Sequence, residues 1–356
     1  MKSFAATTGF RVRAVSFVWC LFAACVAFSA EQFLKPAEQV IFYPAPAWHD
    51  AAAGSWHVPV HARAFEPERR RVTQGLLRAT LGLLAEPRDA AEEKIFAARA
   101  QLFLVDDERG RSVSVRVGGR DFFIAESPGN GHALGEFQLP EAELKTLAGA
   151  DAKTISFRAV LGEGDVREFR GTAPLLAETG LSVVSDIDDT IKISHVRDRR
   201  ELVRKTFYEP FQAVPGMADA YAAWAARGAA FHYVSASPWQ LYGPLAEFTA
   251  ANHFPAGTWH MKQFRVKDGT FTALFDSPEK YKLAVIEPLL RQFPRRKFIL
   301  VGDSGERDPE AYGALARNHP AQIERIFIRD VTGEKADAAR YRAAFHDVPA
   351  ERWKIF

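Results

Sequence analysis

Hydrophobic and polar positions alternate along much of the first half of the chain. Residues 58–64, 113–117 and 155–161 carry an apolar side chain at every second position. A period of two is typical of strands that bury one face. Turn-forming runs such as residues 106–110 separate these strands. The pattern predicts a β-sandwich-like N-terminal domain over residues 30–175.

From about residue 180 the pattern changes to apolar strands that alternate with helical segments. The apolar runs that predict strands are residues 181–185, 230–235, 297–301 and 323–328. Helical patterns lie between them, as in residues 279–293. This alternation predicts a second domain, residues 176–356, of the α/β class, with a parallel sheet covered by helices. Ligands of such sheets bind at the carboxyl ends of the strands.

Acidic and hydroxyl side chains stand at the ends of three of these predicted strands. Asp186 and Asp188 follow the first strand, Ser235 ends the second, and Asp303 and Asp308 follow the third. Because parallel strands end at one edge of the sheet, we expect these side chains to share a crevice. Grouped carboxylates repel one another and are costly to bury without a cation. Oxygen ligands favour a hard ion, so the sequence predicts a Mg²⁺ site.

Composition indicates a globular protein without a strongly charged partner. The chain has 356 residues, of which 47% are hydrophobic and 25% charged, and its formal net charge is +2. This length is sufficient for two domains with separate cores. The small net charge gives no strong electrostatic preference for nucleic acid, and we expect no nucleic-acid partner.

Residues 1–29 have the pattern of an export signal. Basic residues precede the uncharged apolar run Ala14–Phe28, and small residues at Ala27 and Ser29 fit a cleavage site. We therefore expect an exported protein, periplasmic or secreted. Both cysteines of the chain lie in this signal, so no disulfide or thiolate chemistry is expected after cleavage. Lipoprotein anchoring at Cys25 is the alternative interpretation.

Several motifs together carry a resemblance to a known family. They are "SDIDDTIK" at residues 185–192, "YVSASPWQLY" at 233–242, a downstream lysine, and "FPRRKFILVGDSGERDPEAY" at 293–312. Their order and spacing resemble the haloacid dehalogenase (HAD) phosphatase superfamily. More narrowly, residues 180–331 resemble the catalytic domain of the fungal actin-patch phosphatidate phosphatases and their bacterial relatives. The resemblance implies a HAD-like Rossmannoid sheet and Mg²⁺-dependent hydrolysis of a phosphomonoester.

The resemblance also implies a role for each residue at the strand ends. Asp186 would be the nucleophile that forms an aspartyl-phosphate, and Asp188 the general acid and base. Mg²⁺ would be held by Asp186 and Asp303, by Asp308 either directly or through a water molecule, and by the backbone carbonyl of Asp188. Ser235 and a lysine would bind the remaining phosphoryl oxygens.

Two lysines are candidates for this phosphate-binding cation. Lys280 and Lys282 both lie at the start of a predicted helix. The family usually places its lysine directly before an apolar helical run, often after a histidine. Lys282 fits this position better, with Tyr281 in place of the histidine, and Lys280 is the alternative. Of the neighbouring residues, Asp189 is expected to support the loop after the nucleophile and Ser237 to cap the helix that follows.

The intervals between the motifs predict a minimal cap over the site. About 45 residues separate Thr190 from Ser235, and part of them forms a core helix. An open site suits phosphatidate or another bulky phosphorylated substrate. Residues 193–211 are rich in Arg and Lys with interspersed aromatic residues, a pattern that suits peripheral contact with an anionic membrane surface. The alternative interpretation of residues 193–211 is a solvent-exposed helix whose charged side chains pair with one another.

Two other classes of function fit parts of the sequence. A phospho-receiver module also groups carboxylates, a hydroxyl and a lysine, but the export signal and the second acid at Asp188 disfavour it. A non-enzymatic exported binding or scaffold protein with a vestigial phosphatase fold is the main alternative to a phosphatase. The complete set of strand-end residues argues against such decay.

Overall fold

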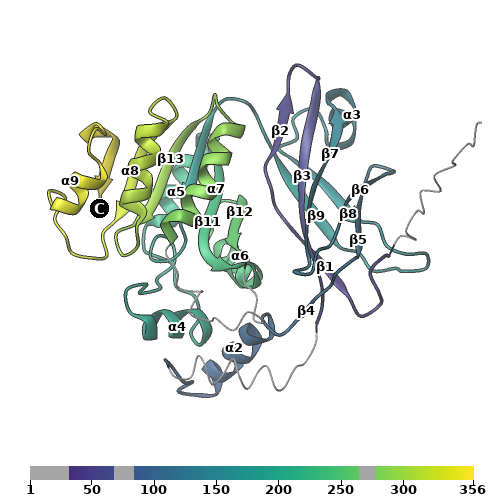
Figure 1. The fold of residues 1–356 in the computed structure, drawn as a ribbon, viewed down its shortest axis with the longest axis horizontal. Helices are drawn as coiled ribbons and strands as arrows, with labels where there is room; N and C mark the ends of the chain where they lie inside the picture. Colours follow the sequence, from purple (N-terminus) through teal and green to yellow (C-terminus); the bar gives the residue numbers. More distant parts are fainter. Residues whose placement is uncertain (1–31, 68–83, 264–277) are drawn as a thin grey trace, which may run out of the picture. The chain divides into compact units, whose positions relative to one another are not determined.

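The computed structural model of the chain describes residues 32–67, 84–263 and 278–356 (Figure 1). The predicted export signal and both cysteines lie outside the described residues. Residues 32–356 form one compact unit. The division into two domains near residue 175 therefore stays a prediction. In the described part of the chain, no helix combines the length and the apolar character needed to cross a membrane.

The first part of this unit is rich in β-structure. Its strands are β1 (Gln39–Tyr43), β2 (Ala47–Asp50), β3 (Ser55–Glu66), β4 (Asp106–Asp107), β5 (Ser112–Val117), β6 (Arg120–Glu126), β7 (His132–Pro140), β8 (Thr154–Ala159) and β9 (Arg170–Leu176), and its helices are α2 (Ala90–Gln101) and α3 (Glu141–Ala148). The strand order is β1-β3-β2-β9-β8-β5-β6, with β4 and β7 paired to β3. The β-rich character is as predicted. The sandwich stays a prediction, because hydrogen bonds join these strands through β9 into one sheet.

The second part has the predicted α/β architecture with a parallel sheet. Its strands are β10 (Leu181–Ser185), β11 (Ala230–Pro238), β12 (Thr258–Lys262), β13 (Lys297–Asp303), β14 (Ile323–Arg329) and β15 (Trp353–Ile355). They are all parallel, in the order β12-β11-β10-β13-β14-β15. The four strands predicted from apolar runs form the centre of this sheet. The two edge strands, β12 and β15, were not predicted, because they are short and carry no continuous apolar run.

Helices cover both faces of the parallel sheet. They are α4 (Arg199–Phe207), α5 (Met217–Ala226), α6 (Tyr242–Ala251), α7 (Pro278–Gln292), α8 (Asp308–Asn318) and α9 (Ala339–Ala344), with the short 3₁₀ turns η1 (Trp239–Leu241) and η4 (Ala350–Arg352). Val183 packs in one core with α5 and α6, whereas its neighbour Val184 packs in the other with α7, α8 and α9. Successive side chains of a strand point to opposite faces, so both faces of β10 are buried. The predicted acidic and hydroxyl site residues lie at the carboxyl ends of these strands.

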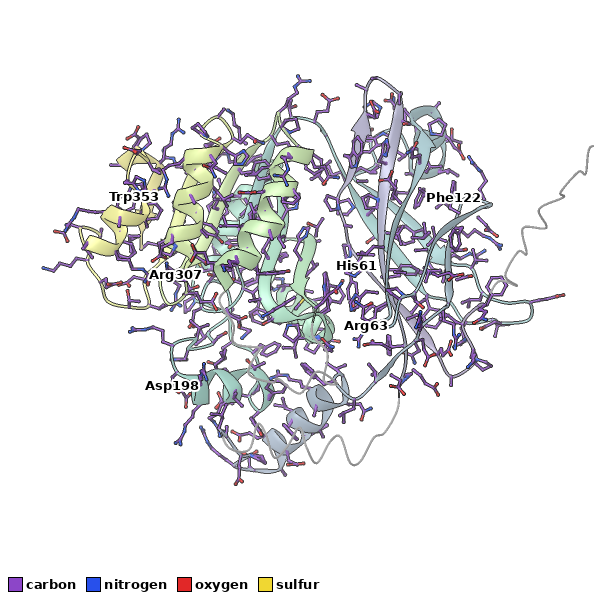
Figure 2. The ribbon with its side chains drawn as sticks, viewed as in Figure 1. His61, Arg63, Phe122, Asp198, Arg307 and Trp353 are labelled. Atoms are coloured by element: carbon purple, nitrogen blue, oxygen red, sulfur yellow. The ribbon has the colours of Figure 1, made fainter. Side chains whose placement is uncertain are left out.

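An aromatic cluster joins the β-rich part to the α/β part. The ring centroid of Tyr43 lies 4.2 Å from that of Trp239, and His61 Nε2 lies 2.8 Å from His132 Nδ1. Figure 2 shows His61 and Arg63 on β3. Burial lowers the pKa of both His61 and His132 to about 3, so both rings are neutral at pH 7. Two neutral histidine rings can lie this close without charge repulsion. The aromatic cluster therefore forms a packed boundary between the β-rich part and the α/β part.

Candidate active site

Asp186 is the first residue after the central strand β10. Its backbone N–H donates to the carbonyl of Val301 at 2.9 Å, which fixes its position beside β13. The side chain is 1% exposed. Its Oδ1 lies 2.9 Å from the Nζ of Lys282, and its Oδ2 accepts a hydrogen bond of 2.9 Å from the hydroxyl of Thr190. Thr190 thus orients the Asp186 carboxylate as well as ordering the loop.

Lys282 is a fully buried cation in the site. It lies in the first half of α7, is 0% exposed, and contacts the carboxylates of Asp186, Glu306 and Asp308. Burial lowers the pKa of Lys282, but the three carboxylates outweigh burial and raise it well above its ordinary value. Lys280, the other candidate, is exposed on the same helix. The structure therefore places Lys282 beside Asp186.

Asp188 has its own buried lysine, which the sequence motifs did not single out. Lys192 is 2% exposed, and its Nζ lies 2.7 Å from Asp188 Oδ1. The same oxygen accepts a hydrogen bond of 2.7 Å from Ser194, and Oδ2 accepts one of 3.0 Å from Ser237. Burial raises the pKa of Asp188, but Lys192 and the two hydroxyls outweigh burial, so the pKa is lowered. Asp188 is therefore a carboxylate at neutral pH.

The two serines near the end of β11 differ in their partners. Ser235, 1% exposed, lies 3.4 Å from Asp188 Oδ2 and accepts a hydrogen bond from the Ser237 backbone N–H. The prediction that Ser237 caps the following helix is wrong, because η1 begins at Trp239 without a side-chain cap. Strand β11 continues to Pro238, and this extended backbone directs the hydroxyl of Ser237 to Asp188 instead.

Asp189 supports the loop that follows Asp186, as predicted. Its backbone has a φ of 55°, in the left-handed region that Asp adopts more readily than most residues. Its carboxylate accepts hydrogen bonds from the backbone N–H groups of Ser194, His195 and Val196 at 2.7–2.9 Å. The side chain therefore closes the loop that leads toward α4.

Three of the predicted metal ligands converge. Carboxylate oxygens of Asp186, Asp303 and Asp308 lie within 4.8 Å of one another. Asp303 Oδ1 accepts the backbone N–H groups of Gly305 and Glu306, but Asp303 Oδ2 is buried without a hydrogen-bond partner. An orphaned buried oxygen beside two further carboxylates fits a hard divalent cation. The side chain of Asp188 makes the other contacts described above and lies outside this group.

Burial acts on the acidity of all three carboxylates. It raises the pKa of Asp186 to about 7 and that of Asp308 to about 6, and Lys282 opposes both shifts. The pKa of Asp303 is also raised well above its ordinary value, by burial and then by the charge of Asp308. A single lysine therefore does not fully compensate the cluster, which is the electrostatic condition that a bound cation would relieve.

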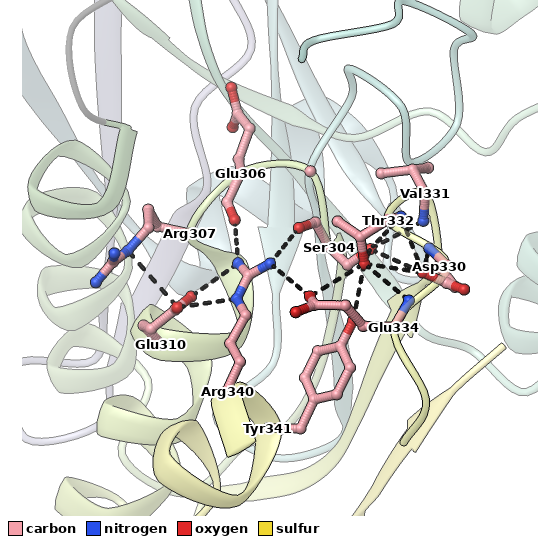
Figure 3. A network of polar contacts seen from close by, with 12 residues as sticks. Ser304, Glu306, Arg307, Glu310, Asp330, Val331, Thr332, Glu334, Arg340 and Tyr341 are labelled. Atoms are coloured by element: carbon pink, nitrogen blue, oxygen red, sulfur yellow. Dashed lines mark hydrogen bonds and ion pairs between the residues drawn. The ribbon is translucent and has the colours of Figure 1, made fainter. Parts of the chain in front are cut away.

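The loop that carries Asp303 and Asp308 is held from the C-terminal segment (Figure 3). Arg340 on α9 donates to the backbone carbonyls of Ser304 and Glu306 and forms an ion pair with Glu310. The sequence offered no signal for Arg340, because it lies 34 residues after Glu306 and belongs to none of the motifs. Its contacts with backbone oxygens depend only on the folded position of α9.

A pocket opens beside Asp186 and has an apolar wall. Asp186, Asp188 and Glu306 line its polar side. The loop before α4 and α4 itself supply the opposite wall, which consists of Val196, Leu202, Val203, Thr206 and Phe207. The sequence of this segment is rich in basic residues, whereas the structure turns its apolar side chains toward the site.

Comparisons with known proteins identify the segment that carries the site. Residues 181–330 match the family model described as the catalytic domain of phosphatidate phosphatase APP1. The predicted family resemblance is confirmed. Phosphatidate phosphatase APP1 of Saccharomyces cerevisiae is 38% identical over 164 residues, which cover 44% of this chain and 27% of the yeast protein. An uncharacterized protein of Schizosaccharomyces pombe is 30% identical over 173 residues, 48% of this chain and 28% of its own length.

The chain thus spans little more than a quarter of the length of these relatives. Among solved structures, a class C acid phosphatase of Bacillus anthracis with tungstate bound aligns with 48% of this chain and 79% of its own, at 14% identity and a TM-score of 0.26. The matched segment begins at β10 and ends after β14. The α2, α9 and β15 elements lie outside it.

Replacement of Lys282 is expected to destabilise the fold. Lys282→Met leaves Asp186 and Asp308 buried without their cation, a change that typically costs about 3–5 kcal/mol. Urea unfolding at pH 8 in EDTA measures this loss. At pH 5.5 the loss should be smaller, because both carboxylates then bind protons. The matched control is Lys280→Met on the exposed side of the helix, expected to change stability by less than about 0.5 kcal/mol. Equal effects of the two changes would contradict this account of the buried charge.

Cation binding is expected to offset a pH-dependent loss of stability. The pKa values of about 7 for Asp186 and about 6 for Asp308 lie above those of an unfolded chain, near 4. The folded protein therefore binds more protons between pH 4 and 7, and its stability falls as pH rises through this window. Excess Mg²⁺, measured by calorimetry against EDTA, should raise Tm more at pH 8 than at pH 5.5.

Asp303→Asn should remove most of this Mg²⁺ effect, because it removes a carboxylate of the cluster. The control is Asp330→Asn, which changes a carboxylate that closes a turn after β14. It should keep the full response. A Mg²⁺ effect that survives Asp303→Asn unchanged would place the cation elsewhere.

Proposed function

We propose that the chain is a phosphatase that hydrolyses a phosphomonoester through an aspartyl-phosphate on Asp186. The observation that carries the proposal is the pairing of Asp186 with the buried Lys282 at the base of a pocket that Asp188 also lines. A carboxylate nucleophile, a second carboxylate two residues later and a fixed cation are the groups that such a reaction needs. The match to an APP1-type catalytic domain supports the same reaction class.

In the first step, a carboxylate oxygen of Asp186 would attack phosphorus, and the bond from phosphorus to the leaving oxygen would break. Asp188 would give that oxygen a proton, which it would take from a phosphate bound as its monoanion, because Asp188 is a carboxylate in the free protein. In the second step, Asp188 would take a proton from water, which attacks phosphorus and releases inorganic phosphate from Asp186. Lys192 favours the carboxylate form of Asp188, which is the form required in the second step. Lys282 and Ser235 would hold the phosphoryl oxygens.

Mg²⁺ is the proposed cation. Asp186, Asp303 and Asp308 would hold it, together with the backbone carbonyl of Asp188. It would supply positive charge that reduces the repulsion between the nucleophile and an anionic phosphate. The unpartnered Oδ2 of Asp303 and the all-oxygen donor set support this choice.

The apolar wall of the pocket supports a bulky apolar substrate. Leu202, Val203 and Phe207 lie across from Asp188, where the leaving group would sit. We therefore propose phosphatidate or a similar apolar phosphomonoester, in agreement with the name of the yeast relative, a phosphatidate phosphatase. If residues 1–29 direct export, the enzyme would meet this substrate outside the cytoplasm.

Contact with an anionic lipid surface is part of the same proposal, but fewer charges support it than the sequence suggested. Arg204 and Lys205 form ion pairs with Glu92 and Glu209 and are not available to lipid. Arg197 and Arg200 are exposed. Sedimentation with phosphatidate-containing vesicles tests the contact, and equal sedimentation of a variant with both exposed arginines changed to Glu would contradict it.

Replacement of the two carboxylates should have different kinetic effects. Asp186→Asn should abolish turnover of every phosphoester. Asp188→Asn removes proton transfer, a loss of about 10²–10⁴-fold with an alkyl leaving group. With p-nitrophenyl phosphate the leaving group needs little protonation, so the intermediate should form and then hydrolyse slowly. Stopped-flow measurement should show a burst of nitrophenolate from Asp188→Asn.

The matched control is Asp219→Asn, which changes an exposed carboxylate on α5. It should retain wild-type rates. Turnover that survives Asp186→Asn would show that another group is the nucleophile. Absence of phosphate release from the wild type with Mg²⁺ would favour the scaffold alternative.

A further inference from the structure

The segment from Ala85 to Leu104 lies between β3 and β4 of the β-rich part, yet packs against the α/β part. It contains α2, which Figure 1 shows beside α4. Phe96, Ala100 and Phe103 of this segment share one buried core with Val203 and Phe207 of α4. The segment lies outside residues 181–330, the region that matches the catalytic family.

A buried ion pair connects the two helices. Arg204 of α4 donates to both carboxylate oxygens of Glu92 on α2, at 2.6 and 2.7 Å. The other terminal nitrogen of Arg204 donates to the backbone carbonyl of Glu86 at 3.0 Å. Arg204 is 8% exposed and Glu92 9%. Because one nitrogen of Arg204 contacts Glu92 and the other contacts Glu86, this side chain holds α4 at two points of the 85–104 segment.

A second arginine, Arg99 on α2, donates hydrogen bonds at the C-terminal end of α4. One terminal nitrogen of Arg99 donates to the carbonyls of Thr206 and Glu209, each at 2.8 Å. Its guanidinium carbon lies 3.8 Å from the centre of the Phe211 ring. Carbonyls in the last turn of a helix have no partner within that helix. Arg99 of the β-rich part thus supplies a hydrogen bond to the last turn of α4, which the helix cannot make for itself, and a second one to the chain just after α4.

Tyr208 adds a third connection next to the pocket wall. Its hydroxyl donates to the carbonyl of Ala85 at 2.9 Å. The Tyr208 ring stacks on Phe96 with ring centroids 5.0 Å apart. The preceding residue, Phe207, lines the pocket. The contacts with the 85–104 segment and the contacts with the pocket therefore involve adjacent residues of α4.

We propose that α2 and its flanking residues are a positioning element for the apolar wall of the substrate pocket. Helix α4 has nine residues, too few to be stable alone in water. One side of it faces the pocket through Leu202, Thr206 and Phe207, and the other is held by α2. The β-rich part therefore sets the recognition of the bulky portion of the substrate, without touching the reacting phosphate. This inference rests on the proposed phosphatase function only for the choice of substrates.

Hydrogen exchange in the full-length protein tests the positioning role without reference to activity. Arg99→Met removes the two hydrogen bonds to α4 and keeps an apolar stem. Amides of residues 203–211 should exchange at least tenfold faster than in the wild type, whereas amides of β13 should not change. The control is Arg120→Met, which removes an arginine of the β-rich part whose ion pair is with Glu143. It should leave the exchange of α4 unchanged.

Kinetics then test the consequence for recognition. Arg99→Met should raise KM for a soluble short-chain phosphatidate about tenfold, with kcat for p-nitrophenyl phosphate within twofold of the wild type. A simple loss of folded protein would lower kcat on both substrates equally and leave both KM values unchanged, which would overturn the inference. An inactive wild type would refute the proposed phosphatase, and hydrogen exchange would still decide the positioning role.

Unchanged exchange in α4 of Arg99→Met would contradict the inference directly. If Arg99→Met does not fold, Glu92→Gln serves as the second variant, because it keeps the shape of the Glu92 side chain and removes its charge opposite Arg204. The same faster exchange of residues 203–211 is then expected. Failure of both variants to fold would show that the segment is required for the whole fold, which would overturn a local positioning role.

Discussion

The ion pairs of Lys282 are the interaction on which the geometry of the site depends. A buried ammonium is stable only where carboxylates surround it, and Asp186, Glu306 and Asp308 do so here. These partners come from the end of β10, from the loop after β13 and from the start of α8. Lys282 itself comes from α7. The charge requirement of one side chain therefore brings four elements of the α/β part to a single point.

The two neighbouring carboxylates of the motif are given opposite acidities by separate lysines. Asp186 shares Lys282 with other carboxylates, and burial raises its pKa to about 7. Asp188 has Lys192 and two hydroxyl donors, which outweigh burial and lower its pKa. Two carboxylates whose surroundings move their pKa values apart are suited to different roles. Without a bound cation this order is the reverse of what the proposed roles need, a charged nucleophile and a protonated general acid. In the proposed reaction the bound cation would lower the pKa of Asp186, and the negative charge of the bound phosphate would raise that of Asp188.

The sequence predicted the centre of the site better than its surroundings. Apolar runs ended by Asp or Ser located β10, β11 and β13, and parallel packing then placed Asp186 and Asp303 together. Such patterns can be read from the sequence because the apolar run of a buried strand and the polar residue that ends it lie within a few residues of each other. Lys192 is the last residue of the motif "SDIDDTIK". Its position four residues after Asp188 gave no reason to expect that the two side chains form a buried ion pair.

The supporting contacts were not predictable for a different reason. Arg340 and Arg99 bind backbone carbonyls, which every residue has, so no partner residue in the sequence marks them. The pairing of Glu92 with Arg204 joins residues 112 positions apart. The basic segment 193–211 suggested a charged surface, and tertiary packing instead buried part of that charge and turned Leu202 and Phe207 toward the pocket.

Chemical trapping of the phosphorylated residue tests the central claim most directly. Enzyme mixed with Mg²⁺ and a phosphomonoester would be quenched in acid during turnover and treated with borohydride, which reduces an acyl phosphate to an alcohol. Peptide mass spectrometry should then find homoserine in place of Asp186 and an unchanged Asp188. Modification of Asp188, phosphate on Ser235, or an unmodified Asp186 under conditions of steady turnover would contradict the account.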